Sequence, residues 1–277
     1  MKKIKRARCI AYILLILISI AMLFPFFWMV RSAFMTNREI MTTPIQWLPS
    51  HYDLENFKKA FERAPFGKYF INSAIIVLIN MVGCILSSSF IAFGFSRLRF
   101  PGRKLWFALL LSTMMIPQTV LMIPQFLIWQ SVGAYNTFIP LTVPCFFGNA
   151  FNVFLVRQFY AGIPKEYDEA ARTDGADEIR TFALILVPML KPVLTVVALF
   201  NFTGVWNDFL WPTIVFNDIN RMPITAGLQL MRGPYKTFDM GVILAAAIIA
   251  IVPTFIIYLF SQKYFLSSLS LGAGIKG

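Results

Sequence analysis

The sequence predicts an all-α membrane protein with six transmembrane helices and both termini in the cytoplasm. The 277-residue chain is 58% hydrophobic and only 14% charged, whereas soluble domains are about one quarter charged. Its mean hydropathy is +0.68. Several runs of about 20 apolar residues carry no charge, and this length is what a helix needs to cross a bilayer. These runs argue against a large soluble core.

The net charge of +12 is also found in proteins that bind nucleic acid, but the positions of the basic residues indicate another role. Basic residues cluster beside apolar runs, where they fix membrane orientation. The amino-terminal cluster consists of Lys2, Lys3, Lys5, Arg6 and Arg8, and the 96–104 loop holds Arg97, Arg99, Arg103 and Lys104. We expect both clusters, together with the 161–181 loop and the carboxyl-terminal tail, to be cytoplasmic.

Cysteine and histidine give no sign of a metal site or of a disulfide framework. Cys9, Cys84 and Cys145 are far apart in the sequence, and their number is odd. The single histidine, His51, stands in a polar stretch and fits an ordinary surface residue.

Six apolar runs define the predicted spans, which are 9–30, 70–95, 105–129, 138–160, 183–205 and 240–260. The first run is too long for the core of a signal peptide and lacks a small-residue cleavage site, so we expect it to be retained. Prolines and amide side chains interrupt the third and fourth runs. They indicate either the interior of a helix bundle, with a translocation pathway, or packing kinks alone.

A short amphipathic helix is predicted between the first two spans. Leu54, Phe57 and Phe61 recur there at helical spacing, with charged residues between them. Such a helix lies either on the membrane surface or on the protein itself.

The 161–181 loop stands out because it holds six of the thirteen acidic residues, namely Glu166, Asp168, Glu169, Asp174, Asp177 and Glu178. Pro164 suits a first helical turn, and acidic residues after it match the positive end of the helix dipole. Gly175 suits the end of this helix. Asp174 or a neighbour is expected to cap a second helix that includes Ile179 and Phe182. The loop therefore predicts a helix–turn–helix.

This loop resembles the EAA signature of ABC importer permeases. The resemblance rests on Glu169-Ala170-Ala171, Asp174-Gly175-Ala176, Phe182, Ile185 and Pro188, with Val187 where leucine is usual. Further runs look like the smaller permease subunit of the maltose-type carbohydrate-uptake branch. They include Ile163 to Tyr167, Trp206 to Pro212 and Leu271 to Gly277. The similarity spans the whole chain and implies a single transmembrane permease domain, 1–277, in the bacterial cytoplasmic membrane.

The resemblance implies a subunit of an ATP-driven sugar importer. Its partners would be a second permease subunit in a heterodimer, two ATPase subunits, an extracytoplasmic sugar-binding protein and membrane lipid. The sequence has no Gly-x-x-x-x-Gly-Lys-Ser/Thr phosphate loop. We therefore expect no cofactor on this chain, and ATP and magnesium on the ATPase subunits.

By the same resemblance, two segments contact the ATPase. The coupling residues are Glu166, Tyr167, Glu169, Ala170, Ala171, Asp174, Gly175, Ala176 and Phe182. Glu169 and Asp174 are also suited to capping helices alone. In the 262–277 tail, the corresponding residues are Gly272, Gly274, Lys276 and Gly277.

Polar residues in the spans are candidates for the translocation pathway. Asn80, Asn149, Asn152 and Asn201 suit hydrogen bonds either to sugar hydroxyls or between helices. Trp206, Asn207 and Asp208 lie near the outer end of the fifth span, where they suit a gate or a contact with the binding protein. A carboxylate is costly in lipid, so Asp208 should face protein or water.

Two other functions remain open from the sequence. A permease of the same superfamily for glycerol phosphate or an oligopeptide is one, although the spans hold almost none of the arginine that an anion would favour. A membrane-embedded enzyme is the other, but it requires clustered His, Asp or Glu near the membrane surface, which the sequence lacks.

Overall fold

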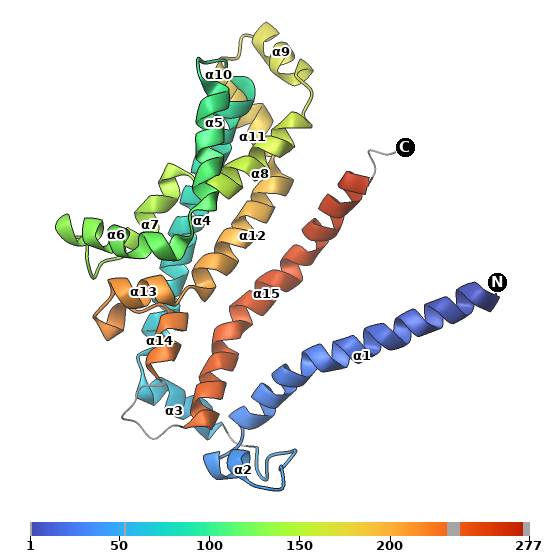
Figure 1. Ribbon diagram of the computed structural model, residues 1–277, viewed down its shortest axis with the longest axis vertical. Helices are drawn as coiled ribbons and strands as arrows, with labels where there is room; N and C mark the ends of the chain where they lie inside the picture. The colour runs from blue at the N-terminus through green and yellow to red at the C-terminus, as the bar shows by residue number, and fades with distance from the viewer. Residues whose placement is uncertain (1, 53, 232–238, 274–277) are drawn as a thin grey trace. The chain divides into compact units, whose positions relative to one another are not determined.

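The computed structural model describes residues 2–52, 54–231 and 239–273, with side chains for 8–52, 54–231 and 239–261. Within these ranges the chain forms helices and no strand (Figure 1), which confirms the all-α prediction. It divides into two compact units. Unit 1 comprises Met1–Gly67 and Gly227–Val252, and unit 2 comprises Lys68–Ala226 and Pro253–Gly277. The helices α4 (Phe66–Arg97) and α15 (Met240–Ala273) run across the boundary between the units.

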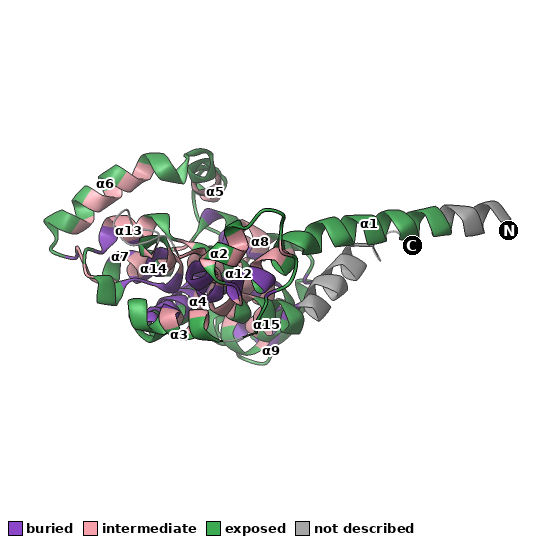
Figure 2. Cartoon of the chain, turned by 90° about the horizontal axis from the view of Figure 1, so that it is seen from below, coloured by how far each residue is buried: buried purple, intermediate pink, exposed green. Residues whose placement is uncertain are grey.

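Unit 1 contains α1 (Lys2–Ala33), α2 (Asn37–Met41), α3 (Glu55–Arg63) and the start of α15. The predicted first span lies within α1, whose residues 8–27 are all exposed (Figure 2). Such a helix, apolar on every side, must find lipid or another protein to cover it.

The predicted amphipathic helix is confirmed as α3, and its apolar side packs within unit 1. The Phe57 ring lies 5.3 Å from that of Phe34, between centroids. The Asn56 amide donates hydrogen bonds to the carbonyl oxygens of Ala33 and Met35, both at 2.9 Å. These contacts tie α3 to the end of α1, whereas its placement on a membrane surface stays a prediction.

Unit 2 is built around α4, which packs against α8 (Ala150–Ala161) and α12 (Lys191–Asn207). Unit 2 also holds the part of α15 from Pro253 onward. Its other elements are α5 (Arg103–Ser112), η1 (Thr113–Met115), α6 (Gln118–Ser131), α7 (Ile139–Thr142), η2 (Val143–Phe147), α9 (Glu166–Thr173), α10 (Glu178–Arg180), the π-helical η3 (Thr181–Leu186), α11 (Val187–Met189), α13 (Leu210–Val215), η4 (Ile219–Arg221) and α14 (Ile224–Leu230), whose end passes into unit 1.

Small residues let other segments approach α4 closely. Gly83 contacts Cys145 so closely that a Cβ added there would lie 2.3 Å from the sulfur. Ser87 donates a hydrogen bond to the carbonyl oxygen of Cys145 at 2.8 Å. In the most apolar window of α4, 44% of residues are buried, against 0% in α1. Part of α4 therefore packs against other segments of the chain, while more than half of this window is not buried.

Four helical stretches among the described residues are long and apolar enough to cross a membrane, namely Arg8–Ala33, Phe66–Arg97, Ile139–Ala161 and Met240–Ser261. They match the predicted spans 9–30, 70–95, 138–160 and 240–260. The number rises to six only if each of two bent helix pairs forms one span. Six spans with both termini in the cytoplasm therefore remain a prediction.

The predicted spans 105–129 and 183–205 are broken. The first is Arg103–Met115 followed by Gln118–Ser131 at 100°. Pro117 forces Ile116 out of the helical region, to φ −86° and ψ 117°, which ends the helix there. The second is Glu178–Met189 followed by Lys191–Asn207 at 76°, with Pro192 just after the break. Pro124, in contrast, lies inside α6.

Candidate functional site

The predicted helix–turn–helix forms at α9 and α10, with a small difference at its start. α9 begins at Glu166, so Pro164 precedes the helix instead of lying in its first turn. Gly175 ends α9 with φ +81°, a left-handed conformation that glycine adopts at no steric cost. Its N–H donates to the carbonyl oxygen of Arg172 at 3.0 Å, and the N–H of Ala176 donates to that of Ala171 at 2.9 Å. This hydrogen-bond pair is a Schellman motif.

Asp177 caps the second helix. Its carboxylate accepts a hydrogen bond from the backbone N–H of Arg180 at 2.7 Å, whereas Asp174 is the C-cap residue of α9. An exposed ion pair between Arg172 and Glu178 joins the two helices across the turn. The acidic residues of this loop therefore shape the turn as well as charging its surface.

A largely buried ion pair fastens α9 to the end of α4. Arg97, the last residue of α4, donates a hydrogen bond from Nη2 to the carbonyl oxygen of Ile163 at 2.9 Å. Its Nε lies 2.9 Å from Oδ2 of Asp168, and the two side chains are only 9% and 16% exposed. Burial raises the pKa of the Asp168 carboxyl above its ordinary value, and Arg97 opposes this rise. The sequence indicated only one role for Arg97, that of a basic residue that fixes the orientation of the chain in the membrane.

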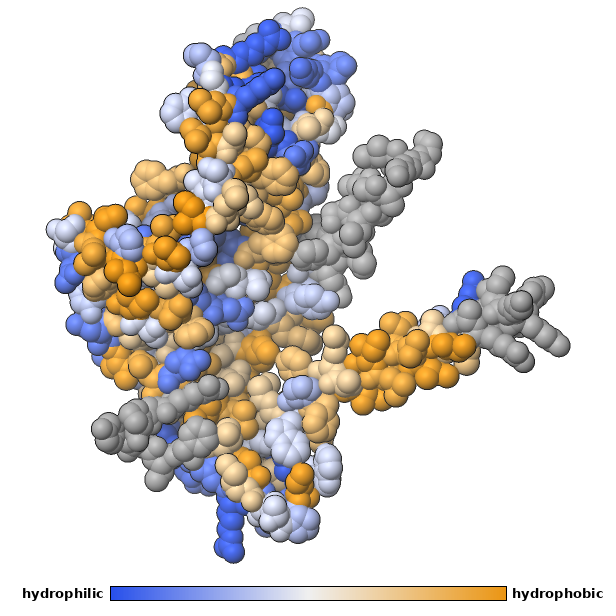
Figure 3. All heavy atoms as spheres, viewed as in Figure 1, coloured by the Kyte–Doolittle hydropathy of each residue, from blue (hydrophilic) through white to orange (hydrophobic). Residues whose placement is uncertain are grey.

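The predicted coupling residues divide between two environments. Phe182 packs into the core of unit 2, with its ring 5.1 Å from that of Phe93 and 5.6 Å from that of Phe90. Ala171 is buried and Ala176 half-buried. The others are exposed on the hydrophilic surface over α9 (Figure 3), namely Glu166, Tyr167, Glu169, Ala170, Asp174 and Gly175.

In the predicted tail, Gly272 lies in the last turn of α15. Gly274, Lys276 and Gly277 lie outside the described residues.

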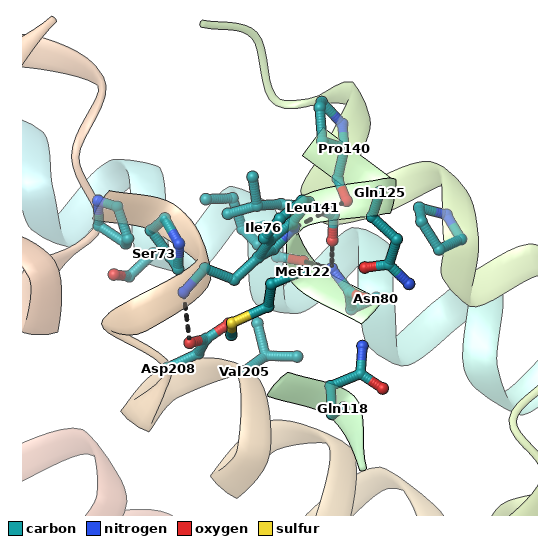
Figure 4. Close-up of a pocket in the computed structure, with 14 residues that line it drawn as sticks. Ser73, Ile76, Asn80, Gln118, Met122, Gln125, Pro140, Leu141, Val205 and Asp208 are labelled. Atoms are coloured by element: carbon teal, nitrogen blue, oxygen red, sulfur yellow. Dashed lines mark hydrogen bonds between the residues drawn. The ribbon is translucent and has the colours of Figure 1, made fainter. Parts of the chain in front are cut away.

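A cavity of about 370 Å³ lies among α4, α6, α7, α12 and α13. Asn80 and Asp208, both predicted pathway residues, line it. Gln118, Gln125 and Trp211 were not predicted as pathway residues, although both glutamines directly follow the prolines that interrupt this region. Figure 4 shows the amides of Asn80, Gln118 and Gln125 and the Asp208 carboxylate around one space.

Backbone contacts hold the polar side chains of this cavity in place. The Asn80 amide donates to the carbonyl oxygens of Leu141 at 2.7 Å and Ile76 at 2.8 Å. The Asp208 carboxylate accepts from the backbone N–H of Trp211 at 3.3 Å. Because Asp208 follows the last residue of α12, it stands where that helix ends.

A more open hollow adjoins the cavity and shares Gln118, Val205 and Asp208 with it. Two further predicted pathway residues, Asn149 and Asn207, line this hollow. The Asn149 side chain also caps α8, accepting from the N–H of Asn152 at 3.2 Å. Gln118 and Asp208 thus stand at the junction of two polar spaces.

The other predicted pathway residues lie outside both spaces. Asn152 is buried and donates to the Cys84 sulfur at 2.9 Å, which ties α8 to α4. Trp206 is buried against the rings of Phe202 and Phe70, each with centroids 5.5 Å away. Asn201 is half-buried in α12 and lines neither space. Of the two roles that the sequence allowed, a hydrogen bond to a sugar or one between helices, Asn152 therefore has the second.

The protein-family profile for the inner membrane component of binding-protein-dependent transport systems matches residues 80–270. The chain is 32% identical to a diacetylchitobiose uptake system permease protein of Streptomyces coelicolor, over 97% of this chain and 89% of that protein. It is 34% identical to an arabinooligosaccharide transport system permease protein of Halalkalibacterium halodurans, over 92% and 91%.

Two further comparisons widen the range of relatives. The chain is 32% identical to an sn-glycerol-3-phosphate transport system permease protein of Salmonella typhi, over 94% of both chains. Its fold is similar to a chain of a bacterial ABC transporter involved in the import of alginate, with a TM-score of 0.84 and 22% identity over 96% of this chain and 98% of that one.

These matches confirm the predicted resemblance to ABC importer permeases. They also agree with the several apolar helices of the fold and place the chain in the inner membrane as a multi-pass transport component instead of an enzyme. Since the family profile covers more than half of the chain, the protein belongs to the family of inner-membrane components of binding-protein-dependent transport systems.

Proposed function

We propose that this chain is a permease subunit of an ATP-driven importer of a neutral oligosaccharide. One observation carries the proposal. The cavity among α4, α6 and α12 is lined by three amides and one carboxylate, with no Lys or Arg among its lining residues. The named substrates of several relatives, among them diacetylchitobiose and arabinooligosaccharides, are sugars.

The chemistry of the cavity suits sugar hydroxyls. The Gln118 and Gln125 amides can donate and accept hydrogen bonds, as a sugar hydroxyl does. Asn80, whose N–H groups bond Ile76 and Leu141, offers only its oxygen, and the Asp208 carboxylate likewise accepts. Ile76, Val205 and Pro140 add apolar surface beside these polar groups. A mainly apolar pocket with a few placed polar groups is typical of small-molecule sites, and a volume of about 370 Å³ falls in their usual range.

A phosphate-bearing solute, such as the one named for the Salmonella relative, is the second candidate. Its negative charge would meet the Asp208 carboxylate with no cation among the lining residues to compensate. The charge of this cavity therefore favours a neutral solute.

The energy for transport would enter through α9 and α10. In this proposal the exposed residues of α9 and the tail residues at 272–277 contact a separate ATPase, which binds ATP and magnesium. The ion pair of Arg97 with Asp168 joins α9 to α4. Since α4 also lines the cavity through Ser73, Ile76 and Asn80, movement of α9 would reach the solute site along one helix.

The remaining partners follow from the same proposal. A second permease subunit, distinct from this chain, and lipid would cover the apolar side chains that α1 leaves exposed. An extracytoplasmic binding protein would deliver the sugar to the side opposite α9. The chain would cross the membrane six times, with each bent helix pair counted as one span.

Uptake by the reconstituted complex tests this function. The chain is purified with its permease, ATPase and binding-protein partners and placed in liposomes, and import of a labelled neutral oligosaccharide is measured with and without ATP. We expect ATP-dependent import that glycerol 3-phosphate does not compete with. Preferred import of glycerol 3-phosphate would contradict the neutral-sugar assignment, and ATP-independent import would contradict the importer class.

A substitution in the cavity links this activity to the site. Asp208→Asn keeps the size of the side chain but removes the charge that strengthens a hydrogen bond, so sugar import should fall by about tenfold. Asp218→Asn is the matched control, because Asp218 lies outside the cavity lining and should leave import unchanged. Equal import by both variants would show that Asp208 does not contribute to the solute site.

A further inference from the structure

A second hollow, separate from the solute cavity, lies where α4 ends and α5, α8 and α9 begin or end. Its volume is about 560 Å³. Four cationic residues line it, Arg97, Arg103, Arg157 and Lys165, together with a single carboxylate, Glu166. The family assignment and the proposed transport activity give this hollow no role.

Most of the positive charge in this hollow is not neutralised within the chain. Arg97 pairs with Asp168. In the described part of the chain, no carboxylate lies within ion-pair distance of Arg103, Arg157 or Lys165, and Glu166 makes no ion pair either. Arg103 and Arg157 are half-buried, and a half-buried cation without a counter-charge is costly, so a bound anion would stabilise this arrangement.

Arg103, the first residue of α5, and Arg157, on α8, are held in place by contacts that leave donors available. The Arg157 guanidinium lies 4.0 Å from the centre of the Phe107 ring, and its Nε donates to the carbonyl oxygen of Phe95 at 3.4 Å. Arg103 donates from Nη1 to the carbonyl oxygen of Leu98 at 3.0 Å. Each guanidinium has five N–H donors in a fixed fork, which matches the oxygens of a phosphate.

The start of α5 adds to the attraction for an anion. Arg103 is the first residue of this ten-residue helix, and its N-cap, Gly102, has no side chain to accept from the free N–H groups. Helix N-termini with free N–H groups favour phosphate.

Apolar surface adjoins the basic hollow. Leu105, Trp106 and Leu109 follow Arg103 on α5, and all three are exposed. Figure 3 shows hydrophobic side chains over the helices next to the hydrophilic end that carries α9. A soluble phosphate would leave this apolar surface uncovered, whereas the acyl chains of a lipid would cover it. Basic pockets between membrane helices are known to bind lipid headgroups.

We propose that the hollow lined by Arg97, Arg103, Arg157 and Lys165 binds the phosphate headgroup of an anionic phospholipid, whose acyl chains lie along the exposed face of α5. The proposal depends on the inner-membrane location and not on which solute is carried. A negatively charged headgroup such as that of phosphatidylglycerol is preferred over the zwitterionic headgroup of phosphatidylcholine.

Lipid titration of the purified importer complex tests this site. The complex is stripped of lipid in detergent, and native mass spectrometry follows the binding of phosphatidylglycerol, phosphatidylcholine and, as a soluble phosphate, glycerol 3-phosphate. We expect phosphatidylglycerol to bind most tightly. In the double variant Arg103→Gln with Arg157→Gln, its affinity should fall by about fivefold for each cation removed.

Matched variants separate the site from general charge and from folding. Arg99→Gln with Lys104→Gln removes two exposed cations close to Arg103 in sequence that do not line the hollow, and should leave binding unchanged. Arg157→Lys keeps the charge and should keep most of the binding, while thermal unfolding reports whether each variant is folded.

Three results would overturn the proposal. Equal affinity for phosphatidylglycerol and phosphatidylcholine would show no headgroup selection. Binding of glycerol 3-phosphate as tight as that of the lipid would identify a site for a soluble phosphate. Unchanged lipid binding in the Arg103→Gln, Arg157→Gln variant, whether or not the ATPase subunit stays bound to the complex, would show that lipid does not bind in this hollow.

Discussion

The coupling end of unit 2, comprising Arg97 and residues 161–182, and the region around the solute cavity are held together differently. At the coupling end, contacts join separate elements: Arg97 of α4 binds Ile163 and Asp168, and Phe182 packs on Phe93. Around the cavity the helices are broken, with a bend of 100° between η1 and α6. Contacts between elements, such as that of Asn80 with Leu141, occur there beside local ones such as that of Asp208 with Trp211. We therefore expect the coupling end to move as one body, and the broken helices around the cavity to change shape at their bends.

One helix connects the two regions. Arg97 stands at the end of α4 and Asn80 lines the cavity from its middle. At about 1.5 Å per residue these positions lie roughly 25 Å apart along the helix. A displacement of the coupling end would therefore arrive at the cavity without passing through a flexible loop.

The largest expected effect comes from breaking the turn of the coupling end. Proline at position 175 would require φ near −65° where the chain has +81°, and it would lose the N–H that binds the Arg172 carbonyl. We expect Gly175→Pro to remain in the membrane fraction while ATP-driven uptake falls to background. Gly175→Asn, which tolerates the left-handed region, should keep uptake. Normal uptake by Gly175→Pro would remove this turn from the coupling path.

The next effect comes from separating α9 from α4. Arg97→Leu leaves the Asp168 carboxylate buried without its partner, and breaking a buried pair in this way costs about 3–5 kcal/mol. Thermal unfolding in detergent measures the loss, and sugar imported per ATP hydrolysed should also fall. Arg99→Leu in the same loop is the control, because Arg99 is exposed. A loss no larger than that of the control would show that the pair does not fasten α9.

The packing of α4, the helix that connects the two regions, can be tested at its close contact with Cys145. Gly83→Ala would place a Cβ 2.3 Å from the Cys145 sulfur and 2.9 Å from the Phe146 ring. Such overpacking costs about 1–3 kcal/mol. Gly94→Ala lies on the same helix with nothing within 4 Å of its added Cβ, so it should be neutral or slightly stabilising. Equal unfolding temperatures for the two variants would contradict the close approach of Cys145 to Gly83.

The smallest effect is a pH dependence at Asp168. Burial raises its pKa in the folded chain above the ordinary value of 3.8. The folded state then holds this proton more tightly than the unfolded state, so stability falls as the pH rises from about 3.8 through the raised pKa. Asp168→Asn removes this contribution. Unfolding temperatures measured across that pH window should fall more steeply for the wild type than for the variant, and parallel curves would contradict the shift.

Features that depend on neighbouring residues could be predicted from the sequence. Runs of apolar residues located the single-helix spans, because length and hydropathy decide them. Gly175 as a helix end and the capping of α10 by a neighbouring acid follow from local backbone geometry. Breaks at Pro117 and Pro192 were also visible as prolines within apolar runs.

Features that depend on tertiary packing could not be predicted. Prolines indicate where a helix stops but not its new direction, so the bends of 100° and 76° were missed. The bond of Asn152 to Cys84 and the pairing of Arg97 with Asp168 join residues 68 and 71 positions apart in the chain. Gln118 and Gln125 gave only a weak signal, since an amide beside a proline is as consistent with packing as with a solute site.

Site-directed cross-linking to the ATPase subunit tests directly whether α9 lies at the end of α4 that meets the ATPase. Glu169→Cys places a thiol on the exposed face of α9. Ile219→Cys places one beside Asn220, whose carbonyl binds Asn72 near the start of α4, roughly 40 Å from Arg97 along that helix. We expect a cross-link to the ATPase from position 169, none from position 219 and none in the unsubstituted chain. A cross-link from position 219 alone would place the ATPase at the opposite end of α4 and would show that α9 does not contact it.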